Sequence, residues 1–257
     1  MMINQTTNQL LDMRLSAMES EFRRQYELPA MTSLSFDERF GLIVEAEWRS
    51  KYNAKIGRML RAAKLRCPAA CLEDVDFDEV RKLDRSLIAR LSDMSWIAEG
   101  RNLFITGATG TGKSWLASAF GNAACCLWKR VSTQRMSRLL DDLHKARADG
   151  TWAKLLASLE KPHLLILDDF GLDRLDTIHC RDLYEIVEDR QGSGSIIITA
   201  QLPVAQWHGI FEDATVADAV LDRLIHAAFR IELHGPSRRM ASAGSGKGGD
   251  PIVKRSR

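Results

Sequence analysis

"LFITGATGTGKSWLASAF", residues 103–120, sets a run of small residues between an apolar strand pattern and a helical pattern. It contains the spacing G-x-x-x-x-G-K-[ST], formed by Gly107, Gly112, Lys113 and Ser114. Glycines let such a loop curl, so that successive backbone N–H groups and the positive end of the following helix face a phosphate. The strand, loop and helix together predict a P-loop that binds the phosphates of a nucleotide.

The whole loop is expected to contact a nucleotide together with Mg²⁺. The ammonium of Lys113 would reach the β and γ oxygens and act in catalysis, and the Ser114 hydroxyl would coordinate the Mg²⁺. A plain glycine-rich turn is the alternative interpretation. The predicted phosphate-binding residues are Gly107, Ala108, Thr109, Gly110, Thr111, Gly112, Lys113, Ser114 and Trp115.

A second motif, HLLILDDF at residues 163–170, ends a buried strand pattern in two acids. Mg²⁺ beside phosphates needs a carboxylate, so we assign Asp168 to the metal and Asp169 to polarising the attacking water. Alternatively, the pair only caps a strand. Asp168 to Gly171 also spells the D-x-x-G of GTP-binding proteins, but the chain lacks the N/T-K-x-D element that these proteins use to read guanine. ATP is therefore the expected nucleotide.

Polar residues further along the chain are candidates for sensing the γ-phosphate. In SIIITAQLP, residues 195–203, Thr199 and Gln201 follow apolar positions; Gln201 is the sensor candidate, with an ordinary strand-end turn as the alternative. In DAVLDRLIHAAFRIEL, residues 218–233, Arg223 lies on a helix that ends shortly before the last strand. We expect it to act as an arginine finger in a neighbouring subunit's site. A solvated or ion-paired arginine is the alternative.

The composition predicts a globular protein. Its 257 residues, 45% of them hydrophobic, are enough for one large domain or two modest ones. Thirty-six basic and 34 acidic residues leave a net charge of +2, so affinity for nucleic acid depends on where the charges lie. The N-terminus lacks a signal-peptide pattern and no segment approaches the roughly 18 apolar residues of a membrane helix, so we expect a cytoplasmic protein without membrane contact. Five cysteines without paired C-x-x-C spacing indicate neither a disulfide framework nor a zinc site.

The pattern of apolar residues changes along the chain. Residues 10–64 have helical periodicity, with Ser35 and Glu38 at the spacing of a capping box. After Arg101, short apolar runs alternate with helical patterns, which is typical of a parallel sheet with crossover helices. We predict a helical N-terminal domain over 1–66, an α/β domain over 67–240 and a disordered basic tail over 241–257.

The stretch RSKYNAKIGRMLRAAKLR, residues 49–66, holds seven basic residues and no acidic one. Wound as a helix, it would set its cations opposite an apolar stripe, which suits docking on the protein while the cations face DNA phosphates. A solvated helix face and a membrane-surface helix are the alternatives. Since no motif that reads bases is present, we expect little sequence specificity. The candidate DNA contacts are Lys51, Lys55, Arg58, Arg61 and Arg66.

Taken together, these motifs resemble the IstB-type transposition helpers, AAA+ ATPases of the clade that includes DnaC helicase loaders and DnaA initiators. The resemblance covers roughly residues 30–240 and includes LSFDERFGLIVEAEW, LLILDDFGLDRL and LDRLIHAAFRIELHG. It implies a P-loop NTPase core with three αβα layers and a five-stranded parallel sheet in the order 5-1-4-3-2, preceded by the small helical domain. It also implies that Leu72, Val75 and Phe77 line the adenine pocket; packing of these connector residues on the core is the alternative.

The resemblance further implies a function. Such helpers self-assemble with ATP on double-stranded DNA, as a ring or a helix of identical subunits, and stimulate the transposase of the same element. We expect slow ATP hydrolysis, because Asp169 stands where most AAA+ proteins have a longer Glu and a misplacement of about 1 Å can cost about 100-fold in rate. A DnaC-like helicase loader and an interaction module whose nucleotide is never hydrolysed are the alternatives.

Overall fold

The computed structural model describes residues 2–237, which form two compact units that meet between Arg58 and Met59. This division falls inside helix α3 and not after Arg66, where the sequence placed a domain boundary. The predicted tail, residues 241–257, lies outside the described residues. We refer to the part before Met59 as the N-terminal unit and to the part from Met59 onward as the C-terminal unit.

Helices make up the N-terminal unit, as expected. Its elements are α1 (Met2–Asp12), α2 (Ser16–Glu27), the 3-10 helix η1 (Pro29–Ser33) and the first part of α3 (Phe36–Ala63). The predicted capping box is confirmed, since Glu38 N–H donates to Ser35 Oγ (3.3 Å) and Ser35 N–H donates to Glu38 Oε2 (2.8 Å). The buried carboxylate of Glu47 on α3 accepts hydrogen bonds from Ala17 and Met18 N–H (2.9 and 3.0 Å). A negative charge at the amino end of α2 is favourable, so Glu47 ties the two helices together.

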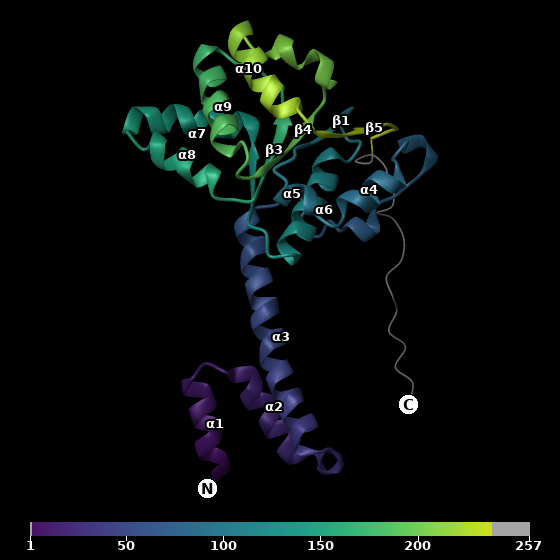
Figure 1. The fold of residues 1–257 in the computed structure, drawn as a ribbon, viewed down its shortest axis with the longest axis vertical. Coiled ribbons are helices and arrows are strands. Elements are labelled where there is room, and N and C mark those ends of the chain that lie inside the picture. The colour runs from purple at the N-terminus through teal and green to yellow at the C-terminus, as the bar shows by residue number, and fades with distance from the viewer. Residues whose placement is uncertain (1, 238–257) are drawn as a thin grey trace, which may run out of the picture. The chain divides into compact units, whose positions relative to one another are not determined.

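A five-stranded sheet, entirely parallel, forms the centre of the C-terminal unit (Figure 1). Its strand order is β2-β3-β4-β1-β5, which confirms the predicted order 5-1-4-3-2 read from the other edge. Parallel strands need apolar residues on both faces, and the short apolar runs of the sequence supply them. The strands are β1 (Leu103–Gly107), β2 (Val131–Arg135), β3 (Leu164–Phe170), β4 (Ser195–Ala200) and β5 (Phe229–Leu233).

Helices cover both faces of the sheet, which gives the three layers predicted (Figure 1). On one face lie α4 (Arg85–Leu91), α5 (Ser95–Ala98) and α6 (Lys113–Cys126). The other face packs against α7 (Met136–Asp149), α8 (Trp152–Glu160), α9 (Thr177–Arg190) and α10 (Ala214–Ile225). Short 3-10 helices η2 (Leu72–Asp74), η3 (Glu79–Arg81) and η4 (Val204–Ile210) complete the unit.

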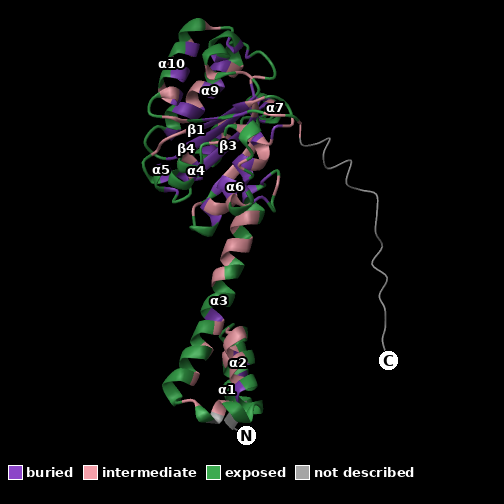
Figure 2. Cartoon of the chain, turned by 90° about the vertical axis from the view of Figure 1, so that its right-hand side faces the viewer, coloured by how far each residue is buried: buried purple, intermediate pink, exposed green. Residues whose placement is uncertain are grey.

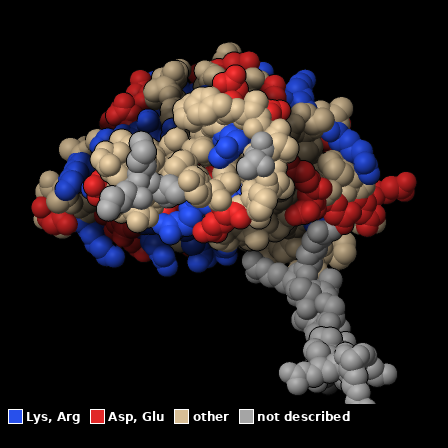
Figure 3. Space-filling view, turned by 90° about the horizontal axis from the view of Figure 1, so that it is seen from below, with Lys and Arg blue, Asp and Glu red and all other residues tan. Residues whose placement is uncertain are grey.

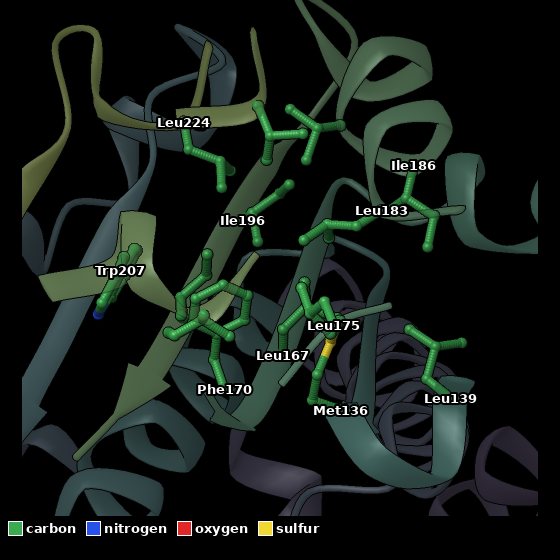
Figure 4. Packing of buried hydrophobic residues seen from close by; sticks show 14 of the residues in the cluster. Met136, Leu139, Leu167, Phe170, Leu175, Leu183, Ile186, Ile196, Trp207 and Leu224 are labelled. Atoms are coloured by element: carbon green, nitrogen blue, oxygen red, sulfur yellow. The ribbon is translucent and has the colours of Figure 1, made fainter. Parts of the chain in front are cut away.

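Alternation along the strands divides the core into two clusters. In β1, Leu103 and Ile105 pack toward α6, whereas Phe104 packs toward α9 and α10. Figure 2 shows the strands as the most continuously buried part of this unit. On the second side the ring of Trp207 lies 4.9 Å from those of both Phe104 and Phe170, centroid to centroid, and Figure 4 shows it at the edge of the aliphatic cluster. These clusters hold the strand ends in place.

The site lies where β1, β3 and β4 end, because the carboxyl ends of neighbouring parallel strands meet at one edge. The pairing of β3 with β4 shifts register between Leu167 and Phe170, where the two acids lie. Asp169 there has φ 63°, a left-handed conformation that is uncommon outside glycine and turns its side chain out of the regular strand.

No helix among residues 2–237 is both long enough and apolar enough to cross a membrane.

Candidate functional site

The phosphate loop joins the end of β1 to the first turn of α6, which begins at Lys113. Gly107, Gly110 and Gly112 have φ of 140°, 82° and 102°, conformations that side-chain-bearing residues rarely adopt. At Gly107 a Cβ would lie 2.3 Å from the carbonyl oxygen of Leu233 on β5, so the loop also runs too close to a neighbouring strand for any side chain. The motif glycines are therefore required by both conformation and space.

Lys113 is buried, and its ammonium donates to the carbonyl oxygens of Gly107 and Ala108, both at 2.8 Å. Its charge is thus held across the mouth of the loop, beside the N–H groups at the start of α6. A phosphate in this loop would meet the ammonium, the helix terminus and the loop amides together. The contact of Lys113 with the β and γ oxygens of a nucleotide stays a prediction.

The first acid of the pair contacts the residue predicted to share a metal ion with it. Asp168 is buried, and its Oδ1 accepts hydrogen bonds from Ser114 Oγ (2.7 Å) and Thr199 Oγ1 (2.6 Å). Thr199 Oγ1 also accepts from the N–H of Asp169 (3.0 Å). The buried hydroxyl of Thr199 therefore contacts both acids, at the side chain of Asp168 and at the backbone N–H of Asp169. The sequence analysis chose Gln201 as the functional residue of this segment and missed this role of Thr199.

Arg66 corrects one prediction. It was expected on the basic face of a helix, but α3 ends at Ala63 and Lys64 has φ 50°, so Arg66 leaves the helix. Its Nη1 lies 2.5 Å from Asp168 Oδ2 and 2.9 Å from Asp169 Oδ2. These two carboxylates raise the pKa of the Arg66 guanidinium above its usual value. A second arginine, Arg135 at the end of β2, lies 3.3 Å from Asp169 Oδ2 through its Nε.

These groups surround a cavity of about 430 Å³, within the range of small-molecule sites. Gln201 reaches it and accepts a hydrogen bond from Thr109 Oγ1 (2.9 Å). Arg81, which the sequence did not single out, donates from Nη2 to the carbonyl of Thr111 (2.8 Å). The cavity is lined by Arg66, Cys67, Arg81, Thr109, Gly110, Gly112, Lys113, Ser114, Trp115, Asp169 and Gln201.

The three residues proposed for adenine lie beside this cavity's helix and not on its lining. Val75 is buried, and Leu72 and Phe77 pack partly buried on the same core cluster, together with Trp115. The guanidinium of Arg85 lies 4.5 Å from the centre of the Phe77 ring. This geometry corresponds to the core-packing alternative, and a contact with adenine remains a proposal.

Arg223 lies in the last turn of α10, away from the phosphate loop of its own chain. It shares a small cavity with Asn102 and Ile196, at the amino ends of β1 and β4, whereas the phosphate loop follows the carboxyl end of β1. Its Nε lies 2.5 Å from Glu188 Oε2, and its Nη2 donates to the hydroxyl of Tyr184 (3.2 Å). Within one chain it is therefore an ion-paired arginine that cannot touch a nucleotide.

The remaining candidate DNA contacts lie on α3 as predicted. Lys51, Arg58 and Arg61 are exposed and Lys55 is half-buried. Lys51 lies 3.5 Å from the carboxylate of Glu47, one helical turn earlier. Part of the positive charge of this helix is thus offset by an acid of the same helix.

The residues fit ATP with Mg²⁺. Hydroxyl and carboxylate oxygens are the ligands that Mg²⁺ prefers, and Ser114 Oγ and Asp168 Oδ1 lie side by side. No group of three or more His, Cys, Asp or Glu residues that could hold a metal occurs in the described part of the chain, so this pair would need oxygens from the nucleotide and water. At Gly110 a Cβ would lie 2.1 Å from Ser237 Oγ, so Ser237 packs directly against the glycine of this loop.

Comparison with known families assigns the chain. Residues 8–244 match the model of the IstB-like ATP-binding proteins. The chain belongs to this IstB-like family. The resemblance inferred from its motifs is thereby confirmed, and ATP is the nucleotide that the family's description names.

Relatives of this IstB-like chain span nearly its whole length. A protein of Sinorhizobium fredii strain NGR234, named as an insertion sequence ATP-binding protein, is 45% identical over 239 residues, which are 93% of this chain and 97% of the relative. The ATP-binding protein named for insertion sequence IS1162 of Pseudomonas fluorescens is 43% identical over 203 residues, 79% of this chain and 88% of the relative.

Solved structures support the fold of the IstB-like chain. A crystal structure of DnaI aligns with a TM-score of 0.56 at 22% identity, over 71% of this chain and 93% of DnaI. DnaA of Aquifex aeolicus bound to AMPPCP aligns with a TM-score of 0.55 at 22% identity, over 68% of this chain and 53% of DnaA. The DnaC helicase loader gives 0.52 at 20% identity, over 64% and 96% of the two chains. At these identities the likeness establishes the AAA+ type of fold alone.

Proposed function

We propose that this protein is an ATP-dependent, largely sequence-nonspecific DNA-binding AAA+ ATPase that self-assembles on double-stranded target DNA and recruits and stimulates the transposase of the same insertion sequence. The observation that carries the ATPase part is that Lys113 and Ser114 line a cavity of about 430 Å³ and that Ser114 contacts the buried Asp168. The transposition part rests on relatives of over 40% identity that are named for insertion sequences.

In the proposed mechanism the chain supplies position and charge. The loop amides and Lys113 hold the phosphates, while Ser114 and Asp168 would hold a Mg²⁺ ion, whose chemistry is to neutralise charge on the β and γ oxygens. Asp169 is placed at the cavity wall to orient and polarise a water molecule. Gln201, held by Thr109, is the proposed sensor of the γ-phosphate. Leu72, Val75 and Phe77 are proposed to approach the adenine.

We expect hydrolysis to be slow. Asp169 reaches less far than the Glu found at this position in most AAA+ proteins, and its carboxylate is already engaged by Arg135. Both effects hold it back from a water molecule, and small misplacements cost large factors in rate. Steady-state phosphate release in the presence of DNA tests this; a rate of tens per second would contradict it.

Assembly is proposed to depend on Arg223. Because it lies far from its own phosphate loop, its guanidinium can meet a nucleotide only in a neighbouring copy of the chain. Such an arginine neutralises charge in the transition state and is worth roughly 10³ to 10⁵ in rate. The γ-phosphate would then draw Arg223 away from Glu188 and join two subunits, which links ATP to assembly.

The proposed DNA contacts on α3 are the exposed Lys51, Arg58 and Arg61 together with the half-buried Lys55. Basic and acidic side chains are interspersed on the face that Figure 3 draws, so this face carries no single broad positive field. Each phosphate neutralised should add about −0.9 to the slope of log affinity against log salt. With DNA and a transposase as its proposed partners, we propose a cytoplasmic location.

The decisive experiment mixes the purified protein with long duplex DNA and with ATP, ADP or no nucleotide, and images the complexes. Regular assemblies that need ATP support the proposal; a protein that stays monomeric and off DNA with saturating ATP and Mg²⁺ refutes it. A DnaC-like helicase loader is the second candidate, favoured by the structural likeness to DnaC and DnaI. Stimulation of strand transfer by the transposase, as against loading of a replicative helicase, separates the two.

A further inference from the structure

The two acids of the site form a concentrated negative charge. The side chains of Asp168 and Asp169 are 4% and 17% exposed, so water screens them poorly. Two ionised carboxylates in a poorly screened place repel each other, and a cation in contact with both relieves this repulsion. This holds whether or not a nucleotide is bound.

Among the contacts described above, Arg66 is the cation that pairs with both acids. Lys113 turns its ammonium to two loop carbonyls, and Arg135 contacts Asp169 alone. Arg66 uses one nitrogen, Nη1, to bridge Asp168 Oδ2 and Asp169 Oδ2, as a small cation would. The side chain therefore neutralises the same carboxylate that is proposed to hold Mg²⁺ with Ser114.

The Arg66 side chain can leave while its backbone stays. The segment is anchored by the buried side chain of Leu65 and by a hydrogen bond from Cys67 N–H to Ser118 Oγ (3.2 Å). In contrast, the Arg66 side chain is 40% exposed and attached at its tip only. Withdrawal of the guanidinium into solvent would cost the two ion pairs and leave the fold intact.

We propose that Arg66 is the internal counter-ion of the Asp168–Asp169 pair and that the magnesium of Mg·ATP replaces it. The inference rests on the proposed magnesium role of Ser114 and Asp168. Without Mg²⁺, Arg66 shields the phosphates from the acids; with Mg²⁺, the ion does so and Arg66 is displaced. Arg66 thus sets how strongly nucleotide binding depends on magnesium.

The test measures the dissociation constant for a fluorescent ATP analogue in Mg²⁺ and in EDTA, and divides the value in EDTA by the value in Mg²⁺. Arg66→Ala should weaken binding in EDTA, strengthen it or leave it unchanged in Mg²⁺, and so raise the ratio roughly tenfold, the size expected for a partly exposed charged contact. Arg66→Lys should stay near the wild type. Arg135→Ala is the matched control, because it removes an arginine from Asp169 only, and its ratio should change less than about threefold.

Three results would count against the idea. An equal loss for Arg66→Ala in both conditions would mean that Arg66 contacts the nucleotide itself; unchanged affinity in both conditions would mean that it does not compete with the metal. An equal rise for Arg135→Ala would assign the effect to overall charge. If thermal melting shows that the Ala variant does not fold, Arg66→Gln takes its place. Failure of the wild type to bind nucleotide in Mg²⁺ would instead refute the proposed function.

Discussion

Replacement of Thr199 by Val should disable the acid pair while keeping the shape of the core. Thr199 lies on β4, fully buried, and its hydroxyl donates to Asp168 Oδ1 (2.6 Å) and accepts from Asp169 N–H (3.0 Å). Val has nearly the same shape, so the substitution removes both hydrogen bonds without making a cavity. The N–H of Asp169, a half-buried residue, is then left without this acceptor, in a residue that already has φ 63°.

The size of the effect follows from these two contacts. A hydrogen bond to a charged group contributes about 1.5–3 kcal/mol, and a buried group that loses its partner costs about 1–3 kcal/mol. The two terms share one hydroxyl and do not add fully, so we expect a loss of about 3 kcal/mol in the free energy of unfolding. Affinity for Mg·ATP should fall as well, since Asp168 and Asp169 lose the group that orients them.

Urea unfolding and binding of a fluorescent ATP analogue provide the assay, with Thr133→Val on β2 as the matched control. The hydroxyl of Thr133 is buried and makes no hydrogen bond within the described residues, so its replacement by a methyl group should be neutral or stabilising. Thr199→Ser keeps a hydroxyl and should recover most of the loss. A loss below about 0.5 kcal/mol for Thr199→Val, or an equal loss for Thr133→Val, would refute the reasoning.

Three further outcomes are expected. Lys113→Ala should lose ATP affinity by at least about tenfold, because the ammonium that would hold the phosphates is gone from the loop; equilibrium dialysis with ATP measures the change. Arg223→Ala should bind ATP normally but fail to assemble on DNA. If this variant both assembles and hydrolyses ATP, the intersubunit role is ruled out. Arg181→Ala, which removes an exposed arginine of α9, is the control. Burial, aided by the charges of Arg130 and Lys129, lowers the pKa of His163 below its ordinary 6.5. The unfolded chain therefore binds the proton more readily, so the stability contributed at this residue is full above pH 6.5 and should fall as the pH drops below it. The Tm at pH 7.5 and 5.5, measured for the wild type and His163→Gln, tests this, and an equal drop in both proteins would exclude His163 as the cause.

Much of this protein could be inferred from local pattern. The capping box at Ser35 depends on atoms three residues apart, and the phosphate loop depends on backbone conformations that glycine alone adopts easily at Gly107 and Gly112. The strand order came from the family resemblance that these motifs carry, and the sheet confirms it. For such features the interacting residues are neighbours in the sequence, or the motif identifies a family whose fold is known.

Arg66 shows where local pattern fails. Seven cations at helical spacing favoured a continuous basic helix through residue 66, yet the chain leaves the helix at Lys64, and Pro68 just beyond could not have continued it. Once outside the helix, Arg66 meets acids about a hundred positions away in the sequence. The proline was the available signal, but it could not say which partner the arginine would find.

By itself, then, the sequence determined the nucleotide loop, the acid pair and the family, because each is set by residue types at short fixed spacings. Only the tertiary structure decided that Thr199 holds both acids, that Arg66 neutralises them and that Arg223 faces away from its own loop. These contacts join residues from separate strands and helices, and their geometry depends on which strand ends meet at the sheet edge and on where each helix stops.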